Sequence, residues 1–196
     1  MKPHTMAERA KFYAEAEPGQ KWPASVPFIG ADGRLQVIWL LGNDYRSKTG
    51  YHGSYPPGYL PRVAAMFPDA ERVLHLFSGS LPAGDYTRFD LREDVTCDVR
   101  GDAHQLGSIF ADQTFDIIYA DPPYTSEDAN AYGTPMVNRN TIVREVYKIL
   151  EPGGYLVWLD MVLPMYRKVE LELAGVIGVV RSTNHRFRCV AIFKRL

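Results

Sequence analysis

Short apolar runs recur along the chain, and they predict the strands of a buried sheet. A parallel strand that is covered on both faces is hydrophobic at nearly every position. The runs lie at residues 72–77, 115–120, 155–159, 176–181 and 189–193, and residues 86–90, which are more polar, are a further strand candidate. A short polar stretch joins the last two runs as a hairpin, so the final strand is expected to be antiparallel. Crossovers join the others, which predicts a mostly parallel sheet.

Helical spacing of apolar residues separates several of these strands. Residues 141–150 place apolar side chains at positions 142, 143, 146, 149 and 150, which form one face of a helix. Good helix formers extend over residues 5–16, where Thr5 followed by Glu8 has the pattern of a capping box. Further helices are expected at residues 59–67 and 165–173. Strands that alternate with helices indicate an α/β domain.

Two segments depart from this alternation. About eight residues separate the first two predicted strands, which is too few for an ordinary crossover helix. Either that helix is missing or cut to a turn, or the strand order differs at this point. The segment 42–60 is rich in Gly, Pro and Tyr and is expected to be a functional loop. We therefore expect one compact domain. Residues 1–71 supply a helix, a hairpin that turns at Asp32-Gly33 and this loop, and they pack on a core of residues 72–196.

Composition and charge limit the functions that are open to the chain. It is 46% hydrophobic and 23% charged, with a formal net charge of −1. Such a chain has no overall field for a polyanion, so nucleic-acid binding requires a local basic patch. Cys97 and Cys189 lack metal-ligand spacing and predict two reduced thiols, no bound metal and a cytoplasmic protein. No apolar run reaches the roughly 20 residues that a membrane span needs.

The strongest candidate for chemistry is the turn Asp121-Pro122-Pro123-Tyr124, which ends the run at 115–120. Two consecutive prolines cannot continue a ladder, so the strand stops in a rigid turn. A carboxylate at the carboxyl end of a parallel strand faces the crevice in which α/β folds bind ligands. Asp121 and the Pro122 carbonyl can accept hydrogen bonds from one exocyclic amine, and the Tyr124 ring can stack on a flat base. The alternative is a structural turn with a surface tyrosine.

This tetrapeptide resembles the (Asp/Asn/Ser)-Pro-Pro-(Tyr/Phe) motif of the amino-methyltransferases, which are class I enzymes. The resemblance covers about residues 72–196 and is strong where helix 141–150, Pro152-Gly153-Gly154 and strand 155–159 follow one another. It implies a Rossmann-like class I methyltransferase fold, S-adenosylmethionine as cofactor, and the DPPY residues 121–124 as the catalytic motif. The Asp form is most typical of N6-adenine methylation in DNA, including enzymes of phage type, although some RNA guanine-N2 enzymes share it.

The resemblance also implies a cofactor site on the preceding strands. Phe77, Ser78 and Gly79 stand where the family has its Phe-x-Gly-x-Gly turn, but Leu81 occupies the place of the second glycine. Asp90 ends the next run, as an acidic residue does when it binds ribose hydroxyls. The family places its contact to the adenine amine at a Gly-Asp-Ala sequence, and this assigns Asp102 and Ala103; Asp121 borders the same site. Because Asp is common in turns, structural roles for Asp90 and Asp98 stay open.

Candidate substrate contacts lie in two loops. Tyr51 and Tyr55 stand among basic residues, a mixture that holds single-stranded or flipped bases. A lid that packs on its own domain has the same composition, so both interpretations stay open. Tyr132, together with Asn138 and Arg139, belongs to a loop that is expected to cover the site.

The hairpin near the end of the chain supplies further candidates. If strand 176–181 is parallel to strand 115–120, its turn reaches the sheet edge where Asp121 lies, and brings Asn184, His185 and Arg186 close to the substrate. Arg181, Arg186 and Arg188 are the best candidates for the basic patch. Solvation of a polar turn is the alternative for each of them.

Together, these residues and the resemblance predict an enzyme that methylates an exocyclic amino group of a nucleobase, most favourably N6 of adenine in DNA. The rivals are N4 of cytosine, adenine or guanine in RNA, N5 of glutamine in a protein, and a non-catalytic nucleic-acid-binding subunit. The 72 residues after Tyr124 leave no room for a recognition domain of ~100 residues. Specificity is then low, is supplied by a specificity subunit or homodimer, or is replaced by recognition of structured RNA. No membrane partner is expected.

Overall fold

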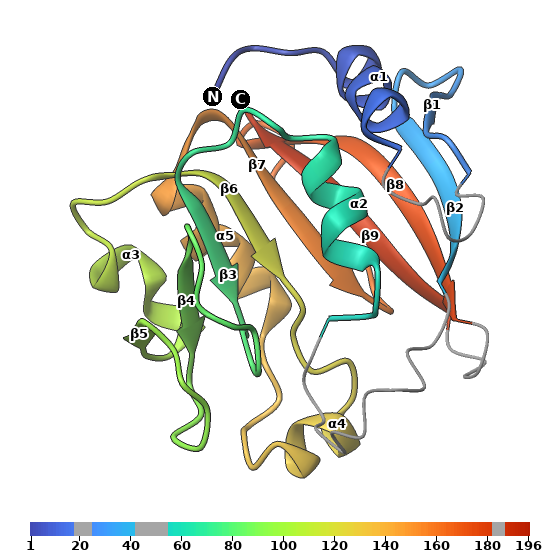
Figure 1. Cartoon of the computed structure of the whole chain (residues 1–196). Coiled ribbons are helices and arrows are strands. Elements are labelled where there is room, and N and C mark those ends of the chain that lie inside the picture. The colour runs from blue at the N-terminus through green and yellow to red at the C-terminus, as the bar shows by residue number, and fades with distance from the viewer. Residues whose placement is uncertain (18–24, 42–54, 182–186) are drawn as a thin grey trace.

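One sheet of nine strands runs through the part of the chain that the computed structural model describes, residues 1–17, 25–41, 55–181 and 187–196 (Figure 1). Across the sheet the strands are β1 (Phe28–Ile29), β2 (Leu35–Leu41), β8 (Leu171–Arg181), β9 (Phe187–Arg195), β7 (Leu150–Asp160), β6 (Phe115–Ala120), β3 (Val73–Leu76), β4 (Thr87–Asp90) and β5 (Val99–Arg100). β1 and β9 are antiparallel to their neighbours, and all other pairs are parallel. The mostly parallel sheet with an antiparallel final strand is confirmed.

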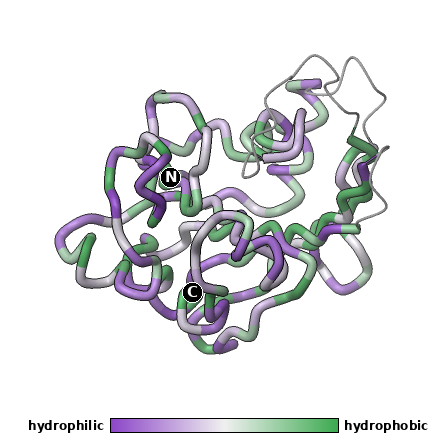
Figure 2. Tube along the Cα trace, turned by 90° about the horizontal axis from the view of Figure 1, so that it is seen from below, coloured by the Kyte–Doolittle hydropathy of each residue, from purple (hydrophilic) through white to green (hydrophobic). Residues whose placement is uncertain are grey.

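Helices cover both faces of this sheet. α1 (Met6–Ala16) and α2 (Tyr59–Ala65) lie on one face, and α3 (Leu106–Ile109) and α5 (Arg139–Ile149) lie on the other (Figure 1). The side chains of β6 alternate between the two layers: Ile117 and Tyr119 pack in the α1 and α2 layer, and Ile118 and Ala120 in the α3 and α5 layer. Hydropathy follows this arrangement, with hydrophobic residues along the strands and hydrophilic residues along many outer loops (Figure 2).

Local sequence signals account for the two longest helices. The Thr5 hydroxyl accepts the Glu8 N–H at 3.2 Å, and the Glu8 carboxylate accepts the Thr5 N–H at 2.7 Å, so the predicted capping box of α1 is confirmed. α5 buries its predicted apolar face, and the Asn138 side chain caps its first turn. No helix in the described ranges is long and apolar enough to cross a bilayer.

The helix expected at residues 165–173 is wrong. Residues 161–170 form a loop there, and β8 begins at Leu171. Leu171 pairs with Arg195, and Leu173 pairs with Phe193, in the antiparallel ladder to β9. A weak local preference for helix is overridden because this ladder satisfies the backbone and buries Leu171, which is 2% exposed.

The shortened first crossover is confirmed. β3 and β4 are parallel neighbours, with Leu74 opposite Thr87, although residues 77–86 between them contain no helix. Along β5-β4-β3-β6-β7 the strand order reverses between β3 and β6, and this is the topological switch point at which doubly wound folds bind ligands. The architecture is that of a Rossmann-like class I methyltransferase fold. Two strands, β1 and β2, extend the sheet beyond β8.

Candidate active site

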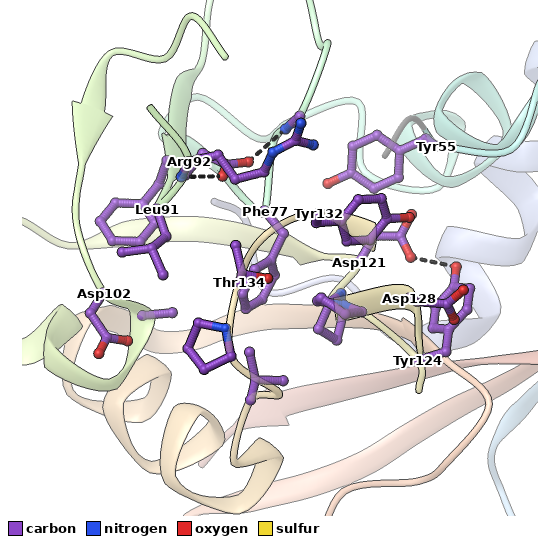
Figure 3. Close-up of a pocket in the computed structure, with 18 of the residues that line it drawn as sticks. Tyr55, Phe77, Leu91, Arg92, Asp102, Asp121, Tyr124, Asp128, Tyr132 and Thr134 are labelled. Atoms are coloured by element: carbon purple, nitrogen blue, oxygen red, sulfur yellow. Dashed lines mark hydrogen bonds between the residues drawn. The ribbon is translucent and has the colours of Figure 1, made fainter. Parts of the chain in front are cut away.

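A pocket of about 470 Å³ opens at the switch point and extends to the ends of β8 and β9 (Figure 3). Its volume is typical of sites that hold a small molecule or cofactor. The predicted site residues that line it are Tyr55, Phe77, Gly79, Asp90, Asp102, Ala103, Asp121, Pro122, Pro123, Tyr124 and Tyr132. Ser78 is buried, 2% exposed, and does not line the pocket. Tyr51, Asn184, His185 and Arg186 lie outside the described residues.

Asp121 and Tyr124 form one polar unit on the pocket wall (Figure 3). The Tyr124 hydroxyl donates a hydrogen bond to Asp121 Oδ1 at 2.5 Å. Burial raises the pKa of Asp121 to about 7, although this hydrogen bond and the charge of Arg188 act in the opposite direction. Burial and the adjacent Asp121 hold the pKa of Tyr124 well above its usual value, so its hydroxyl stays a donor at neutral pH. The protonation of Asp121 is therefore sensitive to a ligand near neutral pH.

An ion pair behind the DPPY turn fixes its position. Arg139, the first residue of α5, donates from Nε to Asp160 Oδ2 at 2.6 Å and from Nη2 to the Tyr124 carbonyl at 2.8 Å. Asp160 ends β7, is fully buried, and also accepts the indole N–H of Trp158 at 3.3 Å. Arg139 thus ties the turn after β6 to the end of β7, and its guanidinium is occupied by these contacts.

Asp90 joins the turns that follow β3 and β4. Its Oδ2 accepts the Gly79 N–H at 2.8 Å, and its Oδ1 accepts the Arg92 N–H at 3.0 Å. Phe77 and Gly79 have φ of 58° and 50°, and this left-handed conformation is strained at a non-glycine residue. Such strain often accompanies a functional turn. A carboxylate has about four acceptor positions, so Asp90 can brace these turns and still accept a ligand hydroxyl.

Asp102 is held by the residue two positions further on. Its Oδ1 accepts the His104 backbone N–H at 2.9 Å and lies 2.6 Å from His104 Nδ1. His104 Nε2 accepts the Asn138 N–H at 3.0 Å, so in this network the ring proton belongs on Nδ1. Within the described residues, no hydrogen bond occupies Asp102 Oδ2. Asp102 can therefore accept a hydrogen bond from a ligand.

Tyr55 and Tyr132 form the upper wall of the pocket in Figure 3. The Tyr55 hydroxyl lies 3.1 Å from His75 Nδ1, and burial lowers the pKa of His75 to about 4, so this histidine is neutral at physiological pH. Arg92 lies over the Tyr132 ring, 5.4 Å from its centre. Both tyrosines are thus oriented by a neighbouring nitrogen group.

One acidic candidate lies outside the pocket, and several residues that line the pocket were not predicted. Asp98 lies outside the pocket, and its carboxylate accepts two hydrogen bonds from the Arg88 side chain, at 2.8 and 3.0 Å. Leu91 and Arg92 line the pocket and were missed. The signal that could have found Leu91 is its position directly after the strand-ending Asp90. His104 and Asp128, which also line the pocket, carry no such signal in the sequence.

Comparison with known proteins gives similarity to solved structures. No protein-family model matches the sequence, and no curated protein matches it. TrmN from Thermus thermophilus is 19% identical, with 64% of this chain and 44% of TrmN covered and a TM-score of 0.46. A proposed SAM-dependent methyltransferase from Streptococcus mutans is 14% identical, with 72% and 50% covered and a TM-score of 0.47. A proposed O-methyltransferase from Klebsiella pneumoniae is 13% identical, with 95% and 88% covered and a TM-score of 0.41.

The match spans half or less of the length of the first two of these proteins. At such identities and scores the likeness concerns the general fold, and it says nothing of substrate. The assignment to the class I methyltransferase fold rests on the strand order and the switch point described above.

Proposed function

We propose that the chain binds S-adenosylmethionine in this pocket and methylates an exocyclic amino group of a nucleobase, with N6 of adenine in DNA as the favoured target. The observation that carries the proposal is the DPPY turn. Its Asp121 carboxyl and Tyr124 ring lie at one end of the pocket and Asp102 lies at the other (Figure 3), and Asp90 also lines this pocket. A ligand that extends between these ends can bring a reactive group to the turn.

The residues present fit this cofactor. Asp90 and Asp102 offer acceptors for ribose hydroxyls and for the adenine amine, and Leu91 and Val137 add apolar surface for a flat ring. The positive φ of Gly79 lets the turn after β3 approach the pocket closely. When bound, the cofactor supplies an electrophilic methyl group.

The DPPY turn would hold the acceptor amine. An aromatic amine is a weak nucleophile because its lone pair is delocalised into the ring. The Asp121 carboxylate and the Pro122 carbonyl accept its two N–H groups, which turns the nitrogen toward tetrahedral geometry and aims its lone pair along one direction. Because the Tyr124 hydroxyl is committed to Asp121, Tyr124 contributes its ring, and a base in a duplex has to be flipped out to reach it.

Calorimetric titration with S-adenosylmethionine tests the cofactor site. We expect micromolar affinity in the wild type, an affinity reduced at least tenfold in Asp102→Ala, and an unchanged affinity in Asp112→Ala, which alters an exposed carboxylate outside this pocket. No binding to the wild type would refute the proposal and leave the non-catalytic nucleic-acid-binding subunit as the better reading.

Transfer of a labelled methyl group to DNA and RNA, measured side by side, tests the chemistry. Asp121→Ala should abolish transfer and spare cofactor binding, because its carboxylate is assigned to the acceptor amine. Retained transfer in this variant would remove Asp121 from the mechanism. Label found in RNA and not in DNA would correct the substrate and keep the reaction.

A further inference from the structure

Arg188 is a buried cation at the Tyr124 end of the pocket. It belongs to the start of β9, is 7% exposed and lines the pocket. Its guanidinium carbon lies over the Tyr124 ring, 5.0 Å from the ring centre. Its Nε and Nη1 atoms are buried without a hydrogen-bond partner, and none of the ion pairs among the described residues involves it. The guanidinium therefore has hydrogen-bonding capacity that the described protein does not use.

No ion pair among the described residues involves Arg188, although its charge acts on Asp121 across the pocket wall. Burying a guanidinium is costly unless it is paired and its donors are satisfied, and contact with an aromatic ring offsets only part of that cost. Arg181, the last residue of β8, lines the same region. Burial and, after it, the charge of Arg188 lower the pKa of Arg181, so the two guanidinium groups repel one another. An anionic ligand would relieve both effects.

The chemistry of the group selects phosphate or carboxylate. The planar fork of a guanidinium matches the paired oxygens of these anions, and Arg is favoured where they are bound bidentately. Asp121 does not fill this role: its Oδ1 accepts the Tyr124 hydroxyl, and no ion pair joins it to Arg188. Arg188 covers one face of the Tyr124 ring, so that face is unavailable for stacking. A base then stacks on the remaining surface of Tyr124, and the sugar and phosphate attached to that base can reach Arg188.

We propose that Arg188, with Arg181 beside it, forms an anion subsite that binds the phosphate of the acceptor nucleotide. The smallest acceptor is then a nucleotide, and a free base or nucleoside binds poorly. This inference rests on the proposed function, because it takes the amine of the same nucleotide to be held at Asp121. The carboxylate of S-adenosylmethionine offers similar chemistry from the other ligand, so the experiment has to separate the two sources.

The test compares the ligands dAMP, deoxyadenosine and S-adenosylmethionine by calorimetry, and measures the thermal midpoint with added inorganic phosphate. The proteins are the wild type, Arg188→Met, Arg188→Lys and the control Arg144→Met, which removes an exposed arginine of α5. Met keeps an apolar stem against the Tyr124 ring and removes a buried charge that has no ion-pair partner among the described residues. We therefore expect Arg188→Met to fold with a thermal midpoint no lower than that of the wild type. Lys keeps the charge and loses the fork.

We expect the wild type and the control to bind dAMP about tenfold more tightly than deoxyadenosine. Arg188→Met should lose this preference and the thermal shift with phosphate, Arg188→Lys should keep part of both, and all four should bind S-adenosylmethionine within twofold. A wild type without preference for dAMP, or one that binds no dAMP at millimolar concentration, would overturn the subsite. A tenfold loss of S-adenosylmethionine affinity in Arg188→Met would also overturn it and assign the anion to the cofactor.

Failure of this subsite is distinguishable from failure of the proposed function. If the wild type binds the cofactor and transfers methyl groups without preferring dAMP, the subsite alone is refuted. If the wild type prefers dAMP to deoxyadenosine, loses this preference in Arg188→Met and binds no cofactor, the anion subsite is supported and the methyltransferase function is refuted.

Discussion

Replacing Asp121 by Asn should stabilise the protein, and the gain should grow with pH. The amide of Asn has nearly the shape of the carboxyl group, and its oxygen can still accept the Tyr124 hydroxyl, which lies 2.5 Å from Asp121 Oδ1. The substitution removes the ionisation that burial opposes. Its effect on stability therefore isolates what the charged form of Asp121 costs the folded protein.

The magnitude follows from the linkage between protonation and folding. Burial raises the pKa of Asp121 in the folded protein from its usual 3.8 to about 7, so the unfolded chain ionises first as pH rises. The wild type consequently loses stability between about pH 4 and pH 7 and no more above that window. At about 1.4 kcal/mol per pKa unit the full loss is about 4 kcal/mol, of which about 2.5 kcal/mol falls between pH 5 and pH 8.

Urea unfolding of both proteins at pH 5 and pH 8 measures this difference. We expect the free energy of unfolding of Asp121→Asn, relative to the wild type, to increase by about 2.5 kcal/mol from the lower to the higher pH. Asp112→Asn, at an exposed position outside the pocket, should show no such increase. An equal advantage of Asp121→Asn at both pH values would refute the reasoning, because Asp121 would then ionise as readily in the folded protein as in the unfolded chain.

Two further predictions concern the pocket, and a third concerns the cap of α1. Methyl transfer by the wild type should rise with pH through about 7, as Asp121 becomes the carboxylate that accepts the amine; a pH–rate profile that is flat from 6 to 8 would contradict this role. Arg139→Met should lower the free energy of unfolding in urea by about 3–5 kcal/mol because it leaves the buried Asp160 unpaired. It should also lower the methyl-transfer rate more than the cofactor affinity. A loss of stability below 1 kcal/mol would show that the ion pair is dispensable. Thr5→Ala should cost about 1 kcal/mol through the α1 cap and leave transfer unchanged; reduced activity would couple α1 to the site.

Much of the sheet and the centre of the site could be predicted because they depend on local patterns. The continuous apolar run of β6 predicts a strand covered on both faces, and two prolines fix where it ends. Asp90 and Asp121 could be expected at one pocket because acidic residues at the ends of parallel strands meet at one edge of a sheet, and both line it. The absence of the first crossover helix could also be predicted, because too few residues separate the two strands to form one.

The remaining features depend on contacts between segments that are distant in sequence. Arg139 was expected in a covering loop, whereas it begins α5 and pairs with Asp160 at the end of another strand. Arg188 could be named as a cation, but its position over Tyr124 follows from the order of β7, β9 and β8. The strand that replaces the expected helix at Leu171 has the same cause, because pairing with β9 decided its conformation.

The place of β2 at the far side of β8 bears on how the protein acquires its structure. Arg34 Nε donates to the Leu173 carbonyl across 139 residues of chain, and the parallel ladder beside it pairs Leu35 with Gly175. During synthesis the β1–β2 hairpin leaves the ribosome long before its partner strand exists. Until β8 emerges, the edge of β2 that will pair with it has no strand neighbour. The early hairpin is thus open to aggregation or chaperone capture until its partner strand is made.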